Sequence, residues 1–368
     1  MDAMILEKPD ATFEMPSWWN RVRMGYPDNQ ALEGDLSLLF WGIPDPFCTL
    51  PPGTDPTAEQ EYWNFGPLPS PFVAESSQLY VRVNLLAAEM NKLNHDPASA
   101  AMFTESNFLA FISAFYRYRH SQMPFIHWPT FDPDTASLPL LLAVALAGAL
   151  FAHSPNDLSS QPLRPSQTLC DTAETFIFSN LEAFDQAPAH SYVKPSVDAV
   201  ETCQAALLME LTQSSFNCYK TRRRILTKRH AYLVAILRSL GVFRTKHMPE
   251  QGKSSWQDFM QVESIIKLAI ATFFADAMFV LYLNHPPCTT ISEMMGDMPC
   301  DERLWSAETE VEFEAQQTLI ESSWRPPSLR EMIPGLFEDQ WTEVNKKILQ
   351  RLSLHDLHIL LWGEFNPQ

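Results

Sequence analysis

Glycine is scarce in this sequence, which has 11 glycines among 368 residues. An average usage of about 7% would give roughly twice that number. The two closest glycines, Gly34 and Gly42, lie eight residues apart. The dinucleotide-binding G-x-G-x-x-G loop, the P-loop and the G-x-S-x-G elbow all need nearby glycines, because the backbone must approach a phosphate or turn sharply beneath a nucleophile. These three classes of enzyme are therefore excluded.

Closely spaced cysteines are absent too. No two of the six cysteines lie within ten residues of each other, so the sequence has no C-x-x-C pair. Zinc fingers, zinc clusters and redox dithiols need such pairs, and we therefore predict none in this chain. Widely spread cysteines in a long chain are typical of reduced thiols in an intracellular protein.

The sequence also lacks the common patterns of helical metalloenzymes. It contains no H-E-x-x-H, no E-x-x-H and no D-D-x-x-D, which argues against metalloproteases, di-iron bundles and isoprenoid synthases. His355 and His358 lie three residues apart. Two imidazoles without a third ligand form a poor metal site, so we interpret them as surface histidines.

Asp276 lies in the otherwise apolar stretch 273–279. A buried carboxylate is costly unless it is paired or hydrogen-bonded. The carboxylate could be a catalytic acid or could bind a ligand. We favour a structural role, with a partner such as an arginine on a neighbouring helix.

Hydrophobic runs are too short for a membrane span. The most apolar run covers the 15 residues 138–152, whereas a span needs about 20. The acidic N-terminus has no features of a signal or transit peptide. We therefore predict a buried helix over 138–152 and no membrane association.

Basic residues are outnumbered by acidic ones. The sequence has 26 Lys and Arg against 44 Asp and Glu, which gives a formal net charge of −18. Such a chain repels nucleic acid and anionic lipid on average. One basic run, 220–230, interrupts this pattern. It has three interpretations: a solvated or salt-bridged helix face, a nuclear import signal, or a phosphate-binding face. The import signal would comprise Arg222, Arg223, Arg224, Lys228 and Arg229.

Residues 1–75 are rich in proline and acidic side chains, which predicts a mostly disordered arm. Acids alternate with leucine and aromatic residues over 35–47. This composition is typical of an activation segment that folds onto a partner. Alternatively, the arm packs its aromatic side chains onto its own domain. The candidate residues of the activation segment are Asp35, Leu38, Leu39, Phe40 and Trp41.

Residues 76–368 show helical periodicity almost throughout. We therefore predict one all-α multi-helix bundle behind the disordered acidic arm. Thr104 is the expected N-cap of one helix, and Gly241 is the expected end of another. The expected helices cover 79–93, 104–115, 138–152, 168–185, 196–216, 219–240, 254–283, 301–320 and 339–362.

Several short motifs follow one another from about residue 105 to about residue 365. The motifs are M-P-F-I-H-W-P-T-F (123–131), the apolar helix (138–152), an Arg-rich helix ending in Leu-Gly (222–241), a W…E…K…F…D helix (256–276), N-H-P-P (284–287), M-P-C-D (298–301) and L-W-S-A (304–307). Their order resembles that of the fungal-specific transcription factor domain, also called the middle homology region. The motif residues that the resemblance marks as structural are Pro124, His127, Pro129, Phe131, Trp256, Glu263, Asp276, Pro299 and Trp305.

The resemblance implies a nuclear transcription regulator of a filamentous fungus that acts on RNA polymerase II transcription. A pathway-specific role, such as control of a secondary-metabolite gene cluster, is expected from the family. The implied partners are other transcription proteins or coactivators, and a small-molecule effector is possible. Catalytic residues and cofactors are not expected in this chain.

The helical subtype resembles that of regulators whose DNA reader is a pair of Cys-Cys-His-His fingers. This chain has no such finger, so we expect DNA contact only through a missing finger or a partner. Zinc is expected only with an upstream finger, and family members usually continue with further helices. Two alternatives follow: a truncated interaction module that pairs with or titrates a full-length regulator and, more remotely, an all-α enzyme.

Overall fold

The computed structural model describes most of the chain from residue 78 onward, and every regular element in the described ranges is a helix. The predicted all-α fold is thereby confirmed. The expected arm (1–75), with its activation segment, lies outside the described residues, as do His355 and His358. The described ranges are 78–94, 100–120, 124–151, 165–185, 194–215, 218–247, 255–319, 327–336, 342–352, 356–357 and 359–360.

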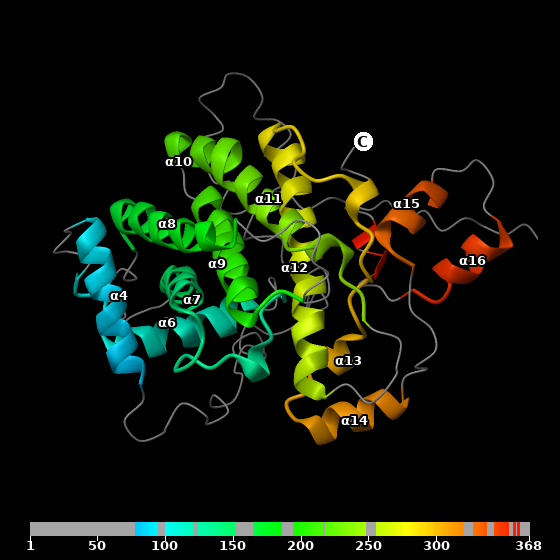
Figure 1. Ribbon diagram of the computed structural model, residues 1–368, viewed down its shortest axis with the longest axis horizontal. Helices are drawn as coiled ribbons and strands as arrows, with labels where there is room; N and C mark the ends of the chain where they lie inside the picture. Colours follow the sequence, from blue (N-terminus) through cyan, green and yellow to red (C-terminus); the bar gives the residue numbers. More distant parts are fainter. Residues whose placement is uncertain are drawn as a thin grey trace, which may run out of the picture.

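Helix α7 (Leu138–Ala149) forms the centre of the first half of the fold (Figure 1). Eleven of its 12 residues are buried, so the predicted buried helix is confirmed, although it ends three residues earlier than expected. α7 packs between α6 (Glu105–Tyr118) and α9 (Val197–Ser215). α8 (Gln167–Leu181) covers α9 and α7, and α4 (Leu79–Leu93) lies outermost against α8. As predicted, Thr104 caps α6 by accepting a hydrogen bond from the backbone N–H of Asn107.

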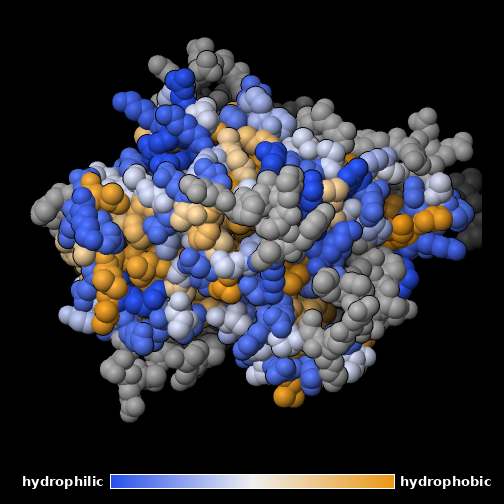
Figure 2. Space-filling model, viewed as in Figure 1, coloured by the Kyte–Doolittle hydropathy of each residue, from blue (hydrophilic) through white to orange (hydrophobic). Residues whose placement is uncertain are grey.

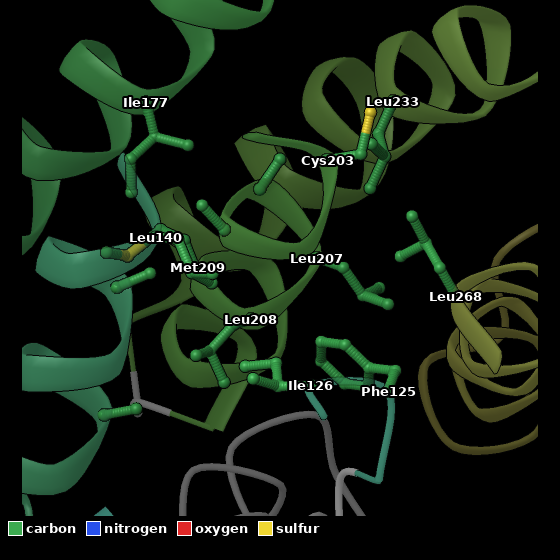
Figure 3. Packing of buried hydrophobic residues seen from close by; sticks show 14 of the residues in the cluster. Phe125, Ile126, Leu140, Ile177, Cys203, Leu207, Leu208, Met209, Leu233 and Leu268 are labelled. Atoms are coloured by element: carbon green, nitrogen blue, oxygen red, sulfur yellow. The ribbon is translucent and has the colours of Figure 1, made fainter. Parts of the chain in front are cut away.

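Side chains of α9 link this half to the rest of the molecule. Leu207 points toward Leu268 of α12 (Trp256–Leu283), whereas Met209 lies beside Leu140 of α7 (Figure 3). All four side chains are at most 2% exposed. Close packing of this kind removes apolar surface from water and is the main stabilising contribution to such a fold.

The single helix expected over 219–240 consists of three parts. It contains α10 (Tyr219–Arg224), the π-helix η5 (Ile225–His230) and α11 (Ala231–Ser239). As predicted, Gly241 ends the run, with a left-handed φ of 73° that favours glycine. The 28-residue α12 follows and ends at Asn284, which is also left-handed.

α12 is long and apolar enough to span a membrane by composition alone. However, 67% of its apolar window is buried inside the molecule, which is typical of the core helix of a globular fold. It contributes to the main hydrophobic core and also to a second cluster that contains Phe259, Trp305 and Phe313.

The last part of the fold differs from the sequence-based expectation. The helix expected over 301–320 is two helices, α13 (Glu302–Trp305) and α14 (Glu310–Leu319). The chain leaves helical geometry between them, where Ala307 is buried in the second cluster. α15 (Leu329–Leu336) was missed because it contains Pro334. Within the helix expected over 339–362, the described residues form α16 (Glu343–Leu349), a turn at 350–351, and further helical residues at 356–357 and 359–360, so the turn interrupts the expected helix.

Short 3₁₀ helices complete the described elements. They are η3 (Trp128–Thr130), η4 (Glu182–Phe184), η6 (Val242–Arg244) and η7 (Ile291–Glu293).

Candidate functional site: the buried polar network along α12

Three charged side chains of the apolar helix α12 are buried, namely Glu263, Lys267 and Asp276. Buried charges are expensive unless they are paired and hydrogen-bonded. Each of the three has partners from a different part of the chain, so α12 carries a polar network through the core.

Asp276 fixes the segment that follows α12. Its carboxylate accepts hydrogen bonds from the backbone N–H groups of Cys288 (2.9 and 3.0 Å to the two oxygens) and Thr289 (2.6 Å). It also accepts a 2.6 Å hydrogen bond from the Thr289 hydroxyl. These donors, together with His230, outweigh burial and lower the pKa of Asp276. The expected structural partners therefore exist, but they are a histidine, two backbone amides and a threonine hydroxyl and not an arginine.

His230 lies between two carboxylates in the core. Its Nδ1 is 2.9 Å from Oε2 of Glu210, and its Nε2 is 3.2 Å from Oδ1 of Asp276. All three side chains are fully buried. Burial alone would lower the pKa of His230, but the two carboxylates raise it to about 9. The imidazolium thus joins η5, α9 and α12.

The π-helix η5 explains how the basic run reaches the core. In a π-helix, residues five apart share one face, because the backbone hydrogen bonds run from i to i+5. Arg224 and Arg229 are five residues apart, and both bind the buried carboxylate of Glu174 at 2.7 Å. Arg224 also binds Asp171 at 2.6 Å. Gln213 donates a further hydrogen bond to Glu174.

The remaining basic side chains of the run differ in exposure. Arg223 and Lys228 are exposed, whereas Arg222 is half-buried. Figure 2 shows hydrophilic side chains gathered over α10, at the top of the view. The five candidate import residues therefore do not form one exposed patch, because the fold engages two of them in ion pairs.

His127 and Trp305 form a second buried contact, near the N-terminal half of α12. Nε2 of His127 lies 2.8 Å from the backbone oxygen of Trp305, and the two rings are 4.6 Å apart. The ammonium of Lys267 lies 4.7 Å from the Trp305 ring centre and 3.1 Å from the carboxylate of Glu302. Trp256 approaches His127 edge-on. Burial lowers the pKa of His127 to about 4, so this histidine is neutral in the fold.

Glu263 connects the same region to two loops. It accepts 2.8 Å hydrogen bonds from Nε2 of His247 and from the backbone N–H of Cys300. Pro299, next to Cys300, is buried. The structure thus brings His127, Trp256, Glu263 and Trp305 together, with Pro299 flanking them.

The other motif residues lie apart from this cluster. Asp276 belongs to the opposite half of α12. Phe131 stacks on Trp128 with ring centres 5.3 Å apart. Pro129 is exposed, and Pro124 is half-buried.

Four important residues were not identified from the sequence: Glu174, Glu210, Gln213 and His230. A signal was present for Glu174 and Glu210, because each is an acid within an apolar helical stretch, as Asp276 is. His230 appeared only as the end of a basic run. Among the described residues, a potential metal-binding group combines His230, Asp276 and Cys288, whose ligand atoms all lie within 4.8 Å of one another.

Comparisons with known proteins place the chain among fungal regulators. A family model described as "Fungal specific transcription factor domain" matches residues 112–354. The chain is 28% identical to transcription factor verF of Penicillium polonicum over 230 residues, which is 61% of this chain and 31% of that protein. It is 24% identical to zinc finger protein zas1 of Schizosaccharomyces pombe over 301 residues, or 79% of this chain and 31% of that protein. The aligned part thus spans about a third of each relative. No solved structure matches the chain significantly.

Proposed function

Because the chain belongs to the fungal specific transcription factor domain family, we propose that it controls a defined set of genes in the nucleus of a filamentous fungus. It is a fungal transcription regulator, in line with its curated relatives. The family is not an enzyme family, and we propose no catalytic activity. The finer role consists of protein contacts that adjust RNA polymerase II transcription, in a pathway such as a secondary-metabolite gene cluster.

The family match over 112–354 carries this proposal. It covers most of the described helices from α6 to α16. Within it, buried charges and aromatic residues are used to connect helices, as His127 does with Trp305 and His230 does with Asp276. Zinc and base reading would come from a finger on another segment or on a partner.

Deletion of the gene tests the regulatory role. We expect a restricted group of transcripts to change, and reintroduction of the intact gene to restore them. RNA sequencing of the deleted, restored and parental strains provides the measurement. An unchanged transcript profile under all growth conditions would refute the proposal.

The acidic arm has a separate test. Residues 1–75 fused to a heterologous DNA-binding domain should activate a reporter, and the double substitution Phe40→Ser with Trp41→Ser should abolish that activation. Trp63→Ser with Phe65→Ser is the matched control, because it removes the same kinds of side chain outside 35–47. A silent fusion, or equal losses in both variants, would remove the activation-segment hypothesis.

Nuclear entry through the basic run can be tested in the same organism. Arg223 and Lys228 are exposed, so Arg223→Ala with Lys228→Ala should reduce nuclear fluorescence of a tagged full chain without unfolding it. Lys346→Ala with Lys347→Ala is the control, since these lysines lie in the exposed α16. Unchanged nuclear signal in the first variant would assign import to another segment or to a partner.

A second candidate function is an interaction module that pairs with or titrates a finger-bearing regulator, the class to which the name of the relative zas1, zinc finger protein, refers. Affinity purification of the tagged full chain from its host should then recover a protein with Cys-Cys-His-His fingers. Overproduction of the chain should change that regulator's targets. Purification without such a protein would argue against this function.

A further inference from the structure

The C-terminal half of α12 places three different metal-ligating side chains together. His230 comes from η5, Asp276 from α12, and Cys288 from the loop after α12. A ring nitrogen of His230, a carboxylate oxygen of Asp276 and Sγ of Cys288 all lie within 4.8 Å of one another, and Nε2 is the nitrogen that faces Asp276. The hydrogen bonds from the Cys288 and Thr289 backbone amides to Asp276 hold the cysteine in this position.

The distance between His230 and Asp276 fits tetrahedral coordination. Zinc binds imidazole nitrogen and carboxylate oxygen at about 2.0–2.1 Å, so neighbouring ligand atoms of a tetrahedron lie roughly 3.3 Å apart. Nε2 of His230 and Oδ1 of Asp276 are 3.2 Å apart. A mixture of imidazole, carboxylate and thiolate ligands favours zinc or a related transition metal over calcium and magnesium, which prefer oxygen alone.

The surroundings also fit a metal centre. Glu210 lies 2.9 Å from Nδ1 of His230, which leaves Nε2 for a metal and reproduces the carboxylate–histidine–metal arrangement of metalloproteins. Among the described residues, the second oxygen of Glu210 is buried without a hydrogen-bond partner. An unsatisfied buried carboxylate oxygen is one sign of an additional cation or water.

We propose that His230, Asp276 and Cys288 bind one transition-metal dication, with zinc as the favoured ion. Binding replaces two protons, one on Nε2 of His230 and one on the Cys288 thiol, and releases both to solvent. The site loses two positive charges as protons and gains two as the metal, so its net charge does not change. The bound ion fastens the loop 284–289 to η5, and it is distinct from any zinc of a DNA-reading finger.

The exposure of the three side chains indicates how a metal ion enters the site. Cys288 is half-buried, whereas His230 and Asp276 are buried. An ion therefore reaches the site from the side of Cys288. A fourth coordination position remains for water, because Glu210 lies on the Nδ1 side of the His230 ring, away from Nε2.

The test uses the purified full chain, stripped of metal with a chelator and then titrated with Zn²⁺ by calorimetry. We expect one ion per chain and a higher unfolding temperature with zinc. Co²⁺ in place of Zn²⁺ should give a thiolate-to-metal absorption band in the near ultraviolet. Cys288→Ser should abolish that band and weaken zinc binding at least about tenfold.

Cys218→Ser is the matched control, because Cys218 is another half-buried cysteine and lies at the start of α10. It should leave the band and the affinity unchanged. Far-ultraviolet circular dichroism of both variants verifies their folding. No stoichiometric binding by the folded chain, or the same binding in Cys288→Ser as in Cys218→Ser, would overturn the proposal.

Discussion

The negative charge of Glu174 is fully paired inside the fold. Its carboxylate is buried and receives hydrogen bonds from Arg224, Arg229 and Gln213. If the carboxylate is removed, the guanidinium groups lose their partner, and such losses are destabilising even where the intact pair adds little net stability. The role of this residue is therefore to fix the position of η5 on α8.

For Glu174→Gln we expect the free energy of unfolding to fall by about 2–3 kcal/mol. This is below the usual range for a fully buried pair, because both arginine side chains keep some contact with water. Urea denaturation followed by circular dichroism measures the change. Glu182→Gln, at an exposed acid just after α8, should change stability by less than about 0.5 kcal/mol. Equal effects at the two sites would contradict this role.

His127 gives a pH-dependent prediction. Burial, helped by the positive charges of His120 and Lys267, lowers its pKa to about 4 in the fold, whereas an unfolded histidine has a pKa of about 6.5. The contribution of His127 is therefore fully present above pH 6.5 and is lost as the pH falls toward 4, because the unfolded chain takes up the proton first. The total loss is up to roughly 3 kcal/mol.

The difference in unfolding free energy between the parent chain and His127→Asn should consequently shrink between pH 7 and pH 4. Nuclear magnetic resonance titration of the His127 ring offers a direct measurement. A midpoint near 6.5 in the folded protein would contradict the prediction.

At the scale of elements, Gly148 and Gly241 are required for different reasons: close helix packing at Gly148 and a left-handed backbone at Gly241. α6 and α7 are in close contact, and Gly148 of α7 faces the backbone of α6. A Cβ atom at this position would overlap the carbonyl oxygen of Phe111 and lie 2.9 Å from the backbone nitrogen of Phe115. Backbone atoms cannot rotate away as a side chain can, so the helices would have to separate.

We therefore expect Gly148→Ala to destabilise the fold by about 3 kcal/mol, despite the higher helix propensity of alanine. Gly241→Ala is the comparison, because its Cβ would meet nothing within 4 Å and only the left-handed φ of 73° is unfavourable. That conformation costs alanine about 1–2 kcal/mol. Thermal unfolding of both variants separates crowding from backbone strain, and a smaller loss for Gly148→Ala would show that α6 and α7 can move apart easily.

The whole molecule is organised around α12, which joins the main hydrophobic core to the second cluster through Phe259 and Met260. Arg224 and Arg229 of the basic run pair with the buried Glu174, so part of the positive charge is neutralised internally. The chain as a whole carries a formal net charge of −18. Long-range electrostatics therefore oppose contact with a phosphate backbone.

The purified chain should accordingly show no shift of duplex DNA at about 0.15 M salt, whatever the sequence of the duplex. Fusion to a known finger pair should restore binding to the site of that finger. Electrophoretic mobility shift assays with both proteins provide the measurement. Sequence-dependent binding by the unfused chain would show that it contains a base-reading element of its own.

The sequence by itself determined the all-α class, the burial of 138–149 and the need of Asp276 for a partner, because each follows from local composition and periodicity. It also excluded the glycine-dependent nucleotide sites. Only the tertiary structure decided which groups meet: His230 and Asp276 are 46 residues apart, and Arg224 and Glu174 are 50 apart. The end of α10 places Arg224, and η5 places Arg229 and His230, against buried carboxylates that come from other helices. A pairing that depends on the positions of several helices at once cannot be deduced from the periodicity of one.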